Sequence, residues 1–136
     1  MSDDAGLDAY GLTLLASAAR GRVAIDSALL SDFDQLEEKA KSQFLRIMDL
    51  WIEARALTPQ QFNGNEGRAK RGSANILLGA FKRFKIRLYG FSHNLSGRRT
   101  FIIIDLDPAK KQDKADPKVL KRAKERALDL VEKIES

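Results

Sequence analysis

Four side chains that can bind or protonate a phosphate alternate along one short stretch of the sequence. Arg83, Lys85, Arg87 and Tyr89 are separated by apolar residues, and a period of two is typical of a β-strand with one polar face. Alternate residues of a strand lie about 6.6–6.8 Å apart, which is similar to the spacing of phosphates along a nucleic-acid strand. The stretch therefore predicts a basic stripe that follows a nucleic-acid backbone, with Tyr89 as a stacking surface or a proton donor.

The same side chains fit cleavage of RNA without a metal ion. In that reaction the 2′-hydroxyl attacks the adjacent phosphate, which requires a base, cations that stabilise the transition state and an acid for the leaving oxygen. Lys85, Arg87 and Tyr89 can share these roles, and Arg99 joins them if a hairpin brings it near Tyr89. Nucleic-acid binding without cleavage, and a charged sheet face that only keeps the protein in solution, are the alternatives.

Composition argues against several other kinds of site. The chain of 136 residues has no cysteine and a single histidine, His93, so disulfides and thiolate chemistry are excluded and a zinc site is improbable. We expect no metal and no cofactor. No apolar run is long enough to span a membrane, and the acidic start Met1-Ser2-Asp3-Asp4 is not a signal peptide, so we expect a cytoplasmic protein.

Charge is distributed unevenly along the chain. Residues 1–66 carry 6 basic and 11 acidic side chains, whereas residues 67–136 carry 18 basic and 8 acidic ones. A one-sided field of this kind attracts a polyanion or an acidic partner. The glycine-bearing stretch 60–73 is interpreted as a mobile basic loop. Its side chains and others of the basic half are the candidate nucleic-acid contacts: Arg68, Lys70, Arg71, Arg83, Lys110 and Lys114.

The elements that must position these residues follow from apolar spacing. We expect one domain over 1–136, with a frayed terminus over 1–9 and a strand over 12–18. Apolar residues from 33 to 52 keep helical spacing, as one helix or as two helices joined near Ser42. Strands over 80–89 and 98–106 form a hairpin around a turn at 90–97, and Asp116-Pro117 starts the last helix.

The segment from Phe84 to Ala127 resembles the RelE/ParE toxin superfamily, in particular its phage-derived, HigB-like branch. The resemblance depends on three pieces in order: Lys85-Ile86-Arg87-Leu88-Tyr89, then Gly97-Arg98-Arg99 before the run Phe101–Ile104, then Lys110-Lys111 before the helix that contains Ala123. It implies an α+β fold in which a small antiparallel sheet packs against helices, with a strand and helices before the β-hairpin and a C-terminal helix after it.

The resemblance also implies a function. It suggests the toxin of a toxin–antitoxin system, a metal-independent endonuclease that cleaves mRNA on the ribosome and is paired with an acidic or amphipathic antitoxin. Arg87 would contact the scissile phosphate, and Lys110 and Lys111 would be the family's paired lysines. ParE relatives inhibit gyrase instead. No Tyr, His or Trp follows Ala115, so proton transfer would fall to Tyr89, His93 or a lysine, and a non-catalytic binding module on the same fold stays open.

Overall fold

A computed structural model of the chain describes Asp4 and residues 6–108 and 116–136. One sheet has the strand order β1-β2-β6-β5-β4-β3, and its neighbours are antiparallel except for the parallel pair β2–β6. Its strands are β1 (Leu12–Ala18), β2 (Gly21–Asp26), β3 (Phe62–Arg71), β4 (Ala74–Arg83), β5 (Ile86–Leu95) and β6 (Arg98–Asp107). The helices are α1 (Leu30–Asp34), α2 (Glu38–Ile52) and α3 (Pro117–Glu135). The predicted α+β class and the C-terminal helix are confirmed.

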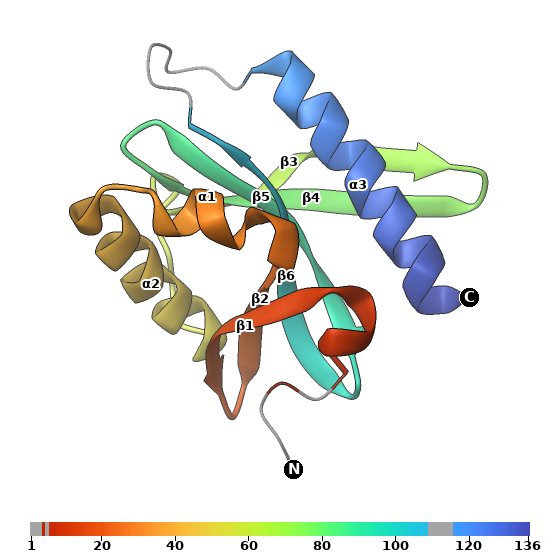
Figure 1. The fold of residues 1–136 in the computed structure, drawn as a ribbon, viewed down its shortest axis with the longest axis horizontal. Coiled ribbons are helices and arrows are strands. Elements are labelled where there is room, and N and C mark those ends of the chain that lie inside the picture. Colours follow the sequence, from red (N-terminus) through yellow and green to blue (C-terminus); the bar gives the residue numbers. More distant parts are fainter. Residues whose placement is uncertain (1–3, 5, 109–115) are drawn as a thin grey trace.

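The helices cover opposite faces of the sheet (Figure 1). Ile102 and Ile104 of β6 belong to a core cluster that includes Ala123 and Ala127 of α3. The alternate residues Phe101 and Ile103 belong to a second cluster, with Phe33 of α1 and Phe44, Met48 and Trp51 of α2. Alternation along each strand therefore places successive side chains in two different cores, which explains why the run Phe101–Ile104 is apolar throughout. We call these two faces the α3 side and the α2 side.

Several predicted boundaries are confirmed. The strand expected over 12–18 is β1, and Asp116 caps α3, since its carboxylate accepts a hydrogen bond from the Lys118 amide at 2.9 Å. Pro117 occupies the first turn of that helix. The stretch with helical spacing forms two helices, which was one of the two predicted alternatives. The break between them lies between Asp34 and Glu38 and not near Ser42.

Two segments expected to be irregular are ordered elements. The stretch 60–73, predicted as a basic loop, contains β3, which pairs with β4 over most of its length. Its polar composition fits an edge strand, because β3 has a neighbour on one side only. Within the expected frayed terminus, Leu7 is fully buried in the α3-side core and Asp8–Tyr10 forms a 3-10 turn. Residues 1–3 and 5 lie outside the described part.

Candidate nucleic-acid interface

The basic stripe predicted over 83–89 does not exist as one strand. Phe84 and Lys85 have positive φ angles of 50° and 66° and form the two-residue turn of a hairpin between β4 and β5. The prediction of a strand over 80–89 is wrong, because the alternation of basic and apolar residues continues through this turn. Two central residues with positive φ are the signature of a type I′ turn, which usually contains Asn and Gly. A Phe-Lys pair carries no such signal.

The turn gathers the cations of the stretch at the tip of the hairpin. Lys82 pairs with Arg87 and lies on the α3 side, whereas Arg83 pairs with Ile86 and lies on the α2 side, where its Nε donates to the Gln43 side chain. A hollow of about 420 Å³ runs beside the tip. It is lined by Pro59, Gln60, Lys82, Arg83, Phe84, Lys85, Ile86 and Arg87. We call Lys82 to Arg87 the basic tip; it contains the sequence-predicted Arg83, Lys85 and Arg87.

Phe84 is the apex of the basic tip, a position that no pattern in the sequence indicates. It is 49% exposed, the most exposed large hydrophobic side chain among the described residues. The Arg83 guanidinium carbon lies 4.8 Å from its ring centroid and the Lys39 ammonium lies 5.7 Å from it. A bulky residue is rare at positive φ, and the strained backbone holds the aromatic ring outside the core instead of inside it. The ring is therefore available to stack on a partner between two cations.

Tyr89 does not belong to this surface. Its side chain is fully buried on the α3 side, and its hydroxyl has no hydrogen-bond partner among the described residues. Burial, with the nearby Glu66 carboxylate as a smaller cause, raises the pKa of Tyr89 to about 12. Because the Tyr89 ring and its hydroxyl are both buried, neither can contact a base or a phosphate bound at the surface. Tyr89 could act as a stacking surface or a proton donor, as the sequence suggested, only if the core on the α3 side were exposed.

A β-bulge builds the polar cluster next to Tyr89. Tyr89 pairs with Asp105 and Gly90 with Ile103, so Ile104 is the extra residue and the side chains of β6 change face after it. Asp105 consequently faces α3, where Arg122 donates from Nε and Nη2 to its two oxygens at 2.7 Å each. Arg126 Nη1 lies 3.2 Å from the same carboxylate. Arg122 and Arg126, two of the basic residues of the C-terminal half, therefore bind the buried Asp105 carboxylate of the same chain.

Arg99 is remote from Arg87 and Tyr89. It pairs with Asn94 in the β5–β6 ladder, whereas Arg87 pairs with Asp107, which lies eight positions further along β6, or about 27 Å along the strand. The expectation that Arg99 lies near Tyr89 is wrong, because β5 runs on to Leu95 and the hairpin turns at Ser96-Gly97. The Arg99 guanidinium instead stacks on Trp51 at 3.5 Å and donates to the Trp51 and Arg20 carbonyls. Burial lowers its pKa.

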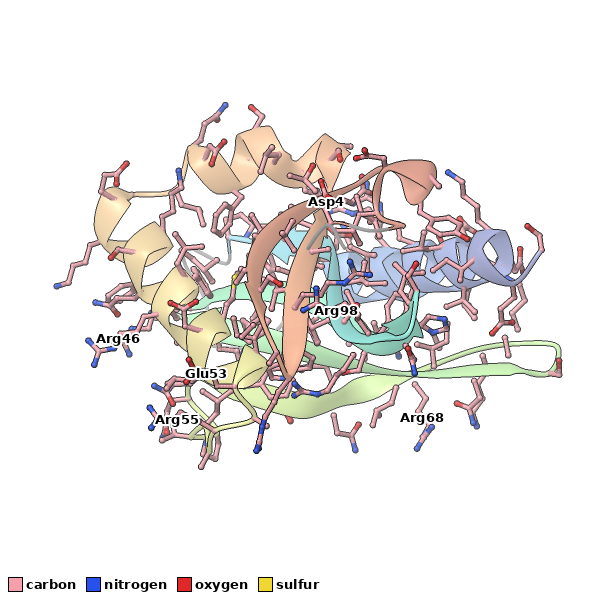
Figure 2. The ribbon with its side chains drawn as sticks, turned by 90° about the horizontal axis from the view of Figure 1, so that it is seen from below. Asp4, Arg46, Glu53, Arg55, Arg68 and Arg98 are labelled. Carbon is pink, nitrogen blue, oxygen red and sulfur yellow. The ribbon has the colours of Figure 1, made fainter. Side chains whose placement is uncertain are left out.

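The remaining candidates are divided between the two sides of the sheet. Arg68 and Lys70 are exposed on the α2 side of β3, and Figure 2 shows Arg68 projecting away from α3. Arg71 faces α3 instead, with ion pairs to Asp129 at 2.8 Å and to Glu132 at 3.1 Å, and these acids raise its pKa. Lys110, Lys111 and Lys114 lie outside the described residues. The structure therefore brings Arg83, Lys85 and Arg87 together at the tip and separates them from Arg99, whereas Tyr89 is buried two residues beyond Arg87 on the same side of β5.

Neither a metal centre nor a membrane helix is found in the part of the chain that the structure describes. No three His, Asp or Glu side chains gather there closely enough to hold a metal ion. No described helix is long and apolar enough to cross a membrane.

Comparison of the chain with protein-family models, with curated proteins and with solved structures finds no match.

Proposed function

We propose that the chain binds a single-stranded nucleic acid through the basic tip. The observation that carries this proposal is the exposed Phe84 ring, held at the end of a hairpin between cations on both faces. An aromatic side chain that stacks on an unpaired base, flanked by Lys and Arg that bind the adjacent phosphates, is the common design of proteins that bind single strands. The hollow beside Phe84 gives the flanking nucleotides a place to lie.

The chemistry of the tip sets the expected behaviour. Lys82, Arg83 and Lys85 can each displace counterions from a phosphate, whereas Arg87 is less accessible because its Nε and Nη1 atoms are buried. The logarithm of affinity falls by about 0.7 per phosphate contact for each tenfold increase in salt. Three or four contacts therefore predict a slope between about −2 and −3. Stacking contributes about 1–3 kcal/mol for each base and tolerates any base, so we expect little sequence preference.

The test is binding of a fluorescent 12-nucleotide RNA, and of the matching DNA, over a range of salt concentrations. We expect Phe84→Ala to weaken binding about 10- to 100-fold with the salt slope unchanged, and Lys85→Gln to reduce the slope by about 0.7. Leu77→Ala is the matched control, because Leu77 is, among the described residues, the other exposed large hydrophobic one at 38% and is far from the tip along β4. Equal binding by the Phe84 and Leu77 variants would contradict the proposal.

A second candidate function uses the same basic tip for catalysis. We infer from the resemblance that the chain is a RelE/HigB-like toxin, a metal-independent ribosome-dependent mRNA endonuclease of the cytoplasm that an acidic or amphipathic antitoxin neutralises. One observation favours it in part: two helices are followed by antiparallel strands and a C-terminal helix, as the resemblance implies, although two strands, β1 and β2, precede these helices where it implies one. In this function Arg87 and Lys85 stabilise the scissile phosphate, while Lys111 is assigned from the sequence alone.

Induced expression in a bacterium tests the second candidate. We expect growth arrest with new mRNA 5′ ends, both lost in Arg87→Ala and Lys111→Ala and retained in Arg99→Ala, because Arg99 lies at the other end of the β5–β6 ladder. Arrest with intact mRNA and inhibited DNA supercoiling would indicate a ParE-like gyrase inhibitor instead. Normal growth with intact mRNA would leave the binding module as the function.

A further inference from the structure

The sheet divides into two branches beyond the middle of β4 and β5. The two strands pair from Arg83↔Ile86 to Gly79↔Gly90, and no further pair follows in the described residues. Beyond the glycines, residues 74–78 of β4 pair only with β3, and residues 91–94 of β5 pair only with β6. Figure 1 shows the β3–β4 hairpin and the β5–β6 hairpin leaving this point in different directions. We call the gap between them the strand fork.

The strand fork encloses a hollow of about 560 Å³. Two strand edges contribute to its walls, since residues 73–77 and 91–93 line it, and residues of α2, β3, β6 and α3 complete the lining. No described strand pairs with either edge on the side of the hollow. The main-chain N–H and C=O groups of alternate residues on each edge therefore face the hollow. A strand edge of this kind is a template for one more strand, and an extended peptide supplies the missing donors and acceptors. Bases and sugars have no comparable ladder of groups.

The two faces of the fork differ in chemistry. On the α3 side the hollow is bordered by Ile76, Phe91 and Val131, which belong to or pack against the core. On the α2 side it is bordered by Arg99 on Trp51 and by the Phe62 and Phe101 side chains, and Arg68 and Lys70 lie beside it because they pair with Leu77 and Asn75. No described carboxylate forms an ion pair with these three cations. His93 and Glu135 also line the hollow, and Glu135 is its one acidic lining residue.

We propose that the strand fork accepts an extended peptide in which apolar and acidic residues alternate. Successive side chains of a strand point to opposite faces, so the apolar residues would lie over Ile76 and Phe91 and the acidic residues would meet Arg99, Arg68 and Lys70. The main-chain ladder supplies affinity and the alternation supplies specificity. This proposal uses the opposite end of β4 from the basic tip and does not depend on nucleic-acid binding.

The probe is an acetylated octapeptide of alternating valine and glutamate. Binding is followed by the fluorescence of Trp51, the only tryptophan, and by hydrogen exchange of the full-length chain. We expect the peptide to slow exchange of amides within 74–78 or 91–94 at least tenfold. We also expect N-methylation of alternate peptide amides to weaken binding at least tenfold, because methylation removes the donors without changing the charge.

Charge is tested by variants of the chain and of the peptide. Arg99→Gln and Arg68→Gln should each weaken binding severalfold, whereas Arg55→Gln should not, since Arg55 is exposed but does not line the hollow. Arg68 is exposed and its described side-chain hydrogen bond is to Asn75, so its variant should fold normally even if loss of the Trp51 stack disturbs Arg99→Gln. Unchanged exchange at both edges, equal binding of the N-methylated peptide, or equal binding of a valine–lysine octapeptide would each overturn the proposal. Protection of these edges by an RNA oligonucleotide and not by the peptide would also overturn it.

Discussion

Gly79 and Gly90 lie directly opposite each other and form the last pair of the β4–β5 ladder before the strand fork. A Cβ on Gly90 would lie 2.2 Å from the Ile102 carbonyl oxygen and 2.6 Å from the Phe101 ring. A Cβ on Gly79 would lie 3.1 Å from the Asn63 carbonyl oxygen. The two branches of the sheet therefore separate at a place where Gly90 leaves no room for a Cβ and Gly79 leaves room only for a tight one.

Gly90→Ala should destabilise the fold strongly. The added methyl group meets the backbone of β6, which cannot move without breaking the β5–β6 ladder, so we expect a loss of about 3 kcal/mol in the free energy of unfolding. Urea unfolding measures it. Gly64→Ala is the control, because its Cβ would make only an ordinary contact of 3.6 Å with Phe62. Similar unfolding midpoints for the two variants would show that Gly90 is not closely packed.

Phe84→Asn should make the protein more stable while weakening nucleic-acid binding. Asn adopts positive φ more readily than Phe, and the type I′ turn favours it, so the free energy of unfolding should rise by about 1 kcal/mol. Loss of the ring should weaken binding in the oligonucleotide assay. Thermal melting and binding measured on one preparation separate these effects. A variant that loses stability and binding together would mean that Phe84 holds the fold instead of a ligand.

Asp105→Ala should cost more stability than Arg122→Ala. Asp105 is buried and binds both Arg122 and Arg126, and its Oδ1 also accepts from the Leu106 amide at 2.8 Å. Its removal leaves a buried amide and two cations without their acceptor, which costs about 2–3 kcal/mol. Arg122 is half exposed and its loss leaves Arg126 in place, so we expect about 1 kcal/mol. Denaturant titration of the two variants should reveal this difference, and equal losses would contradict it.

Tyr89 should make stability fall at high pH. Its pKa is raised from 10.0 to about 12 in the folded chain, so the unfolded state releases the phenolic proton first. The stabilisation is complete below pH 10 and is lost as the pH rises towards about 12, a change of about 2–3 kcal/mol. Tyr89→Phe should remove this part of the pH dependence, measured by urea unfolding between neutral and alkaline pH. At neutral pH the variant should be as stable as the parent or slightly more so, because the hydroxyl lacks a described partner.

The sequence predicted correctly those elements whose formation depends on neighbouring residues, such as a helix cap or a continuous apolar run. Asp116-Pro117 starts α3 because both residues act within the first turn, and the apolar run Phe101–Ile104 forms β6 because both faces of the sheet are covered. The break before α2 and the strand β2 carry no comparable local signal. Arg22 shows why β2 was missed: an arginine in a short strand suggests a surface, yet its side chain is fully buried.

The candidate site depended on a turn that composition does not reveal. Alternation of basic and apolar residues correctly placed strand structure on both sides of Phe84, but it cannot detect that the chain reverses at Phe84-Lys85. The reversal kept Arg83, Lys85 and Arg87 together and sent Tyr89 into the core. Likewise, the bulge at Ile104 changes the face of Asp105, and with it the partners of Arg122, through one extra residue that no local pattern identifies.

The buried Arg22 has a consequence for the order in which the protein is made. Its Nε donates to the Thr100 hydroxyl at 2.9 Å and its Nη2 to the Leu95 carbonyl at 2.9 Å, and β2 joins the sheet through β6 alone on that side. Partners more than seventy residues later in the chain do not exist while the first half is being synthesised. Strand β2 can therefore join the sheet only after the C-terminal β5–β6 hairpin has left the ribosome. Folding is completed late, because the β2–β6 pairing joins residues that are far apart in the sequence.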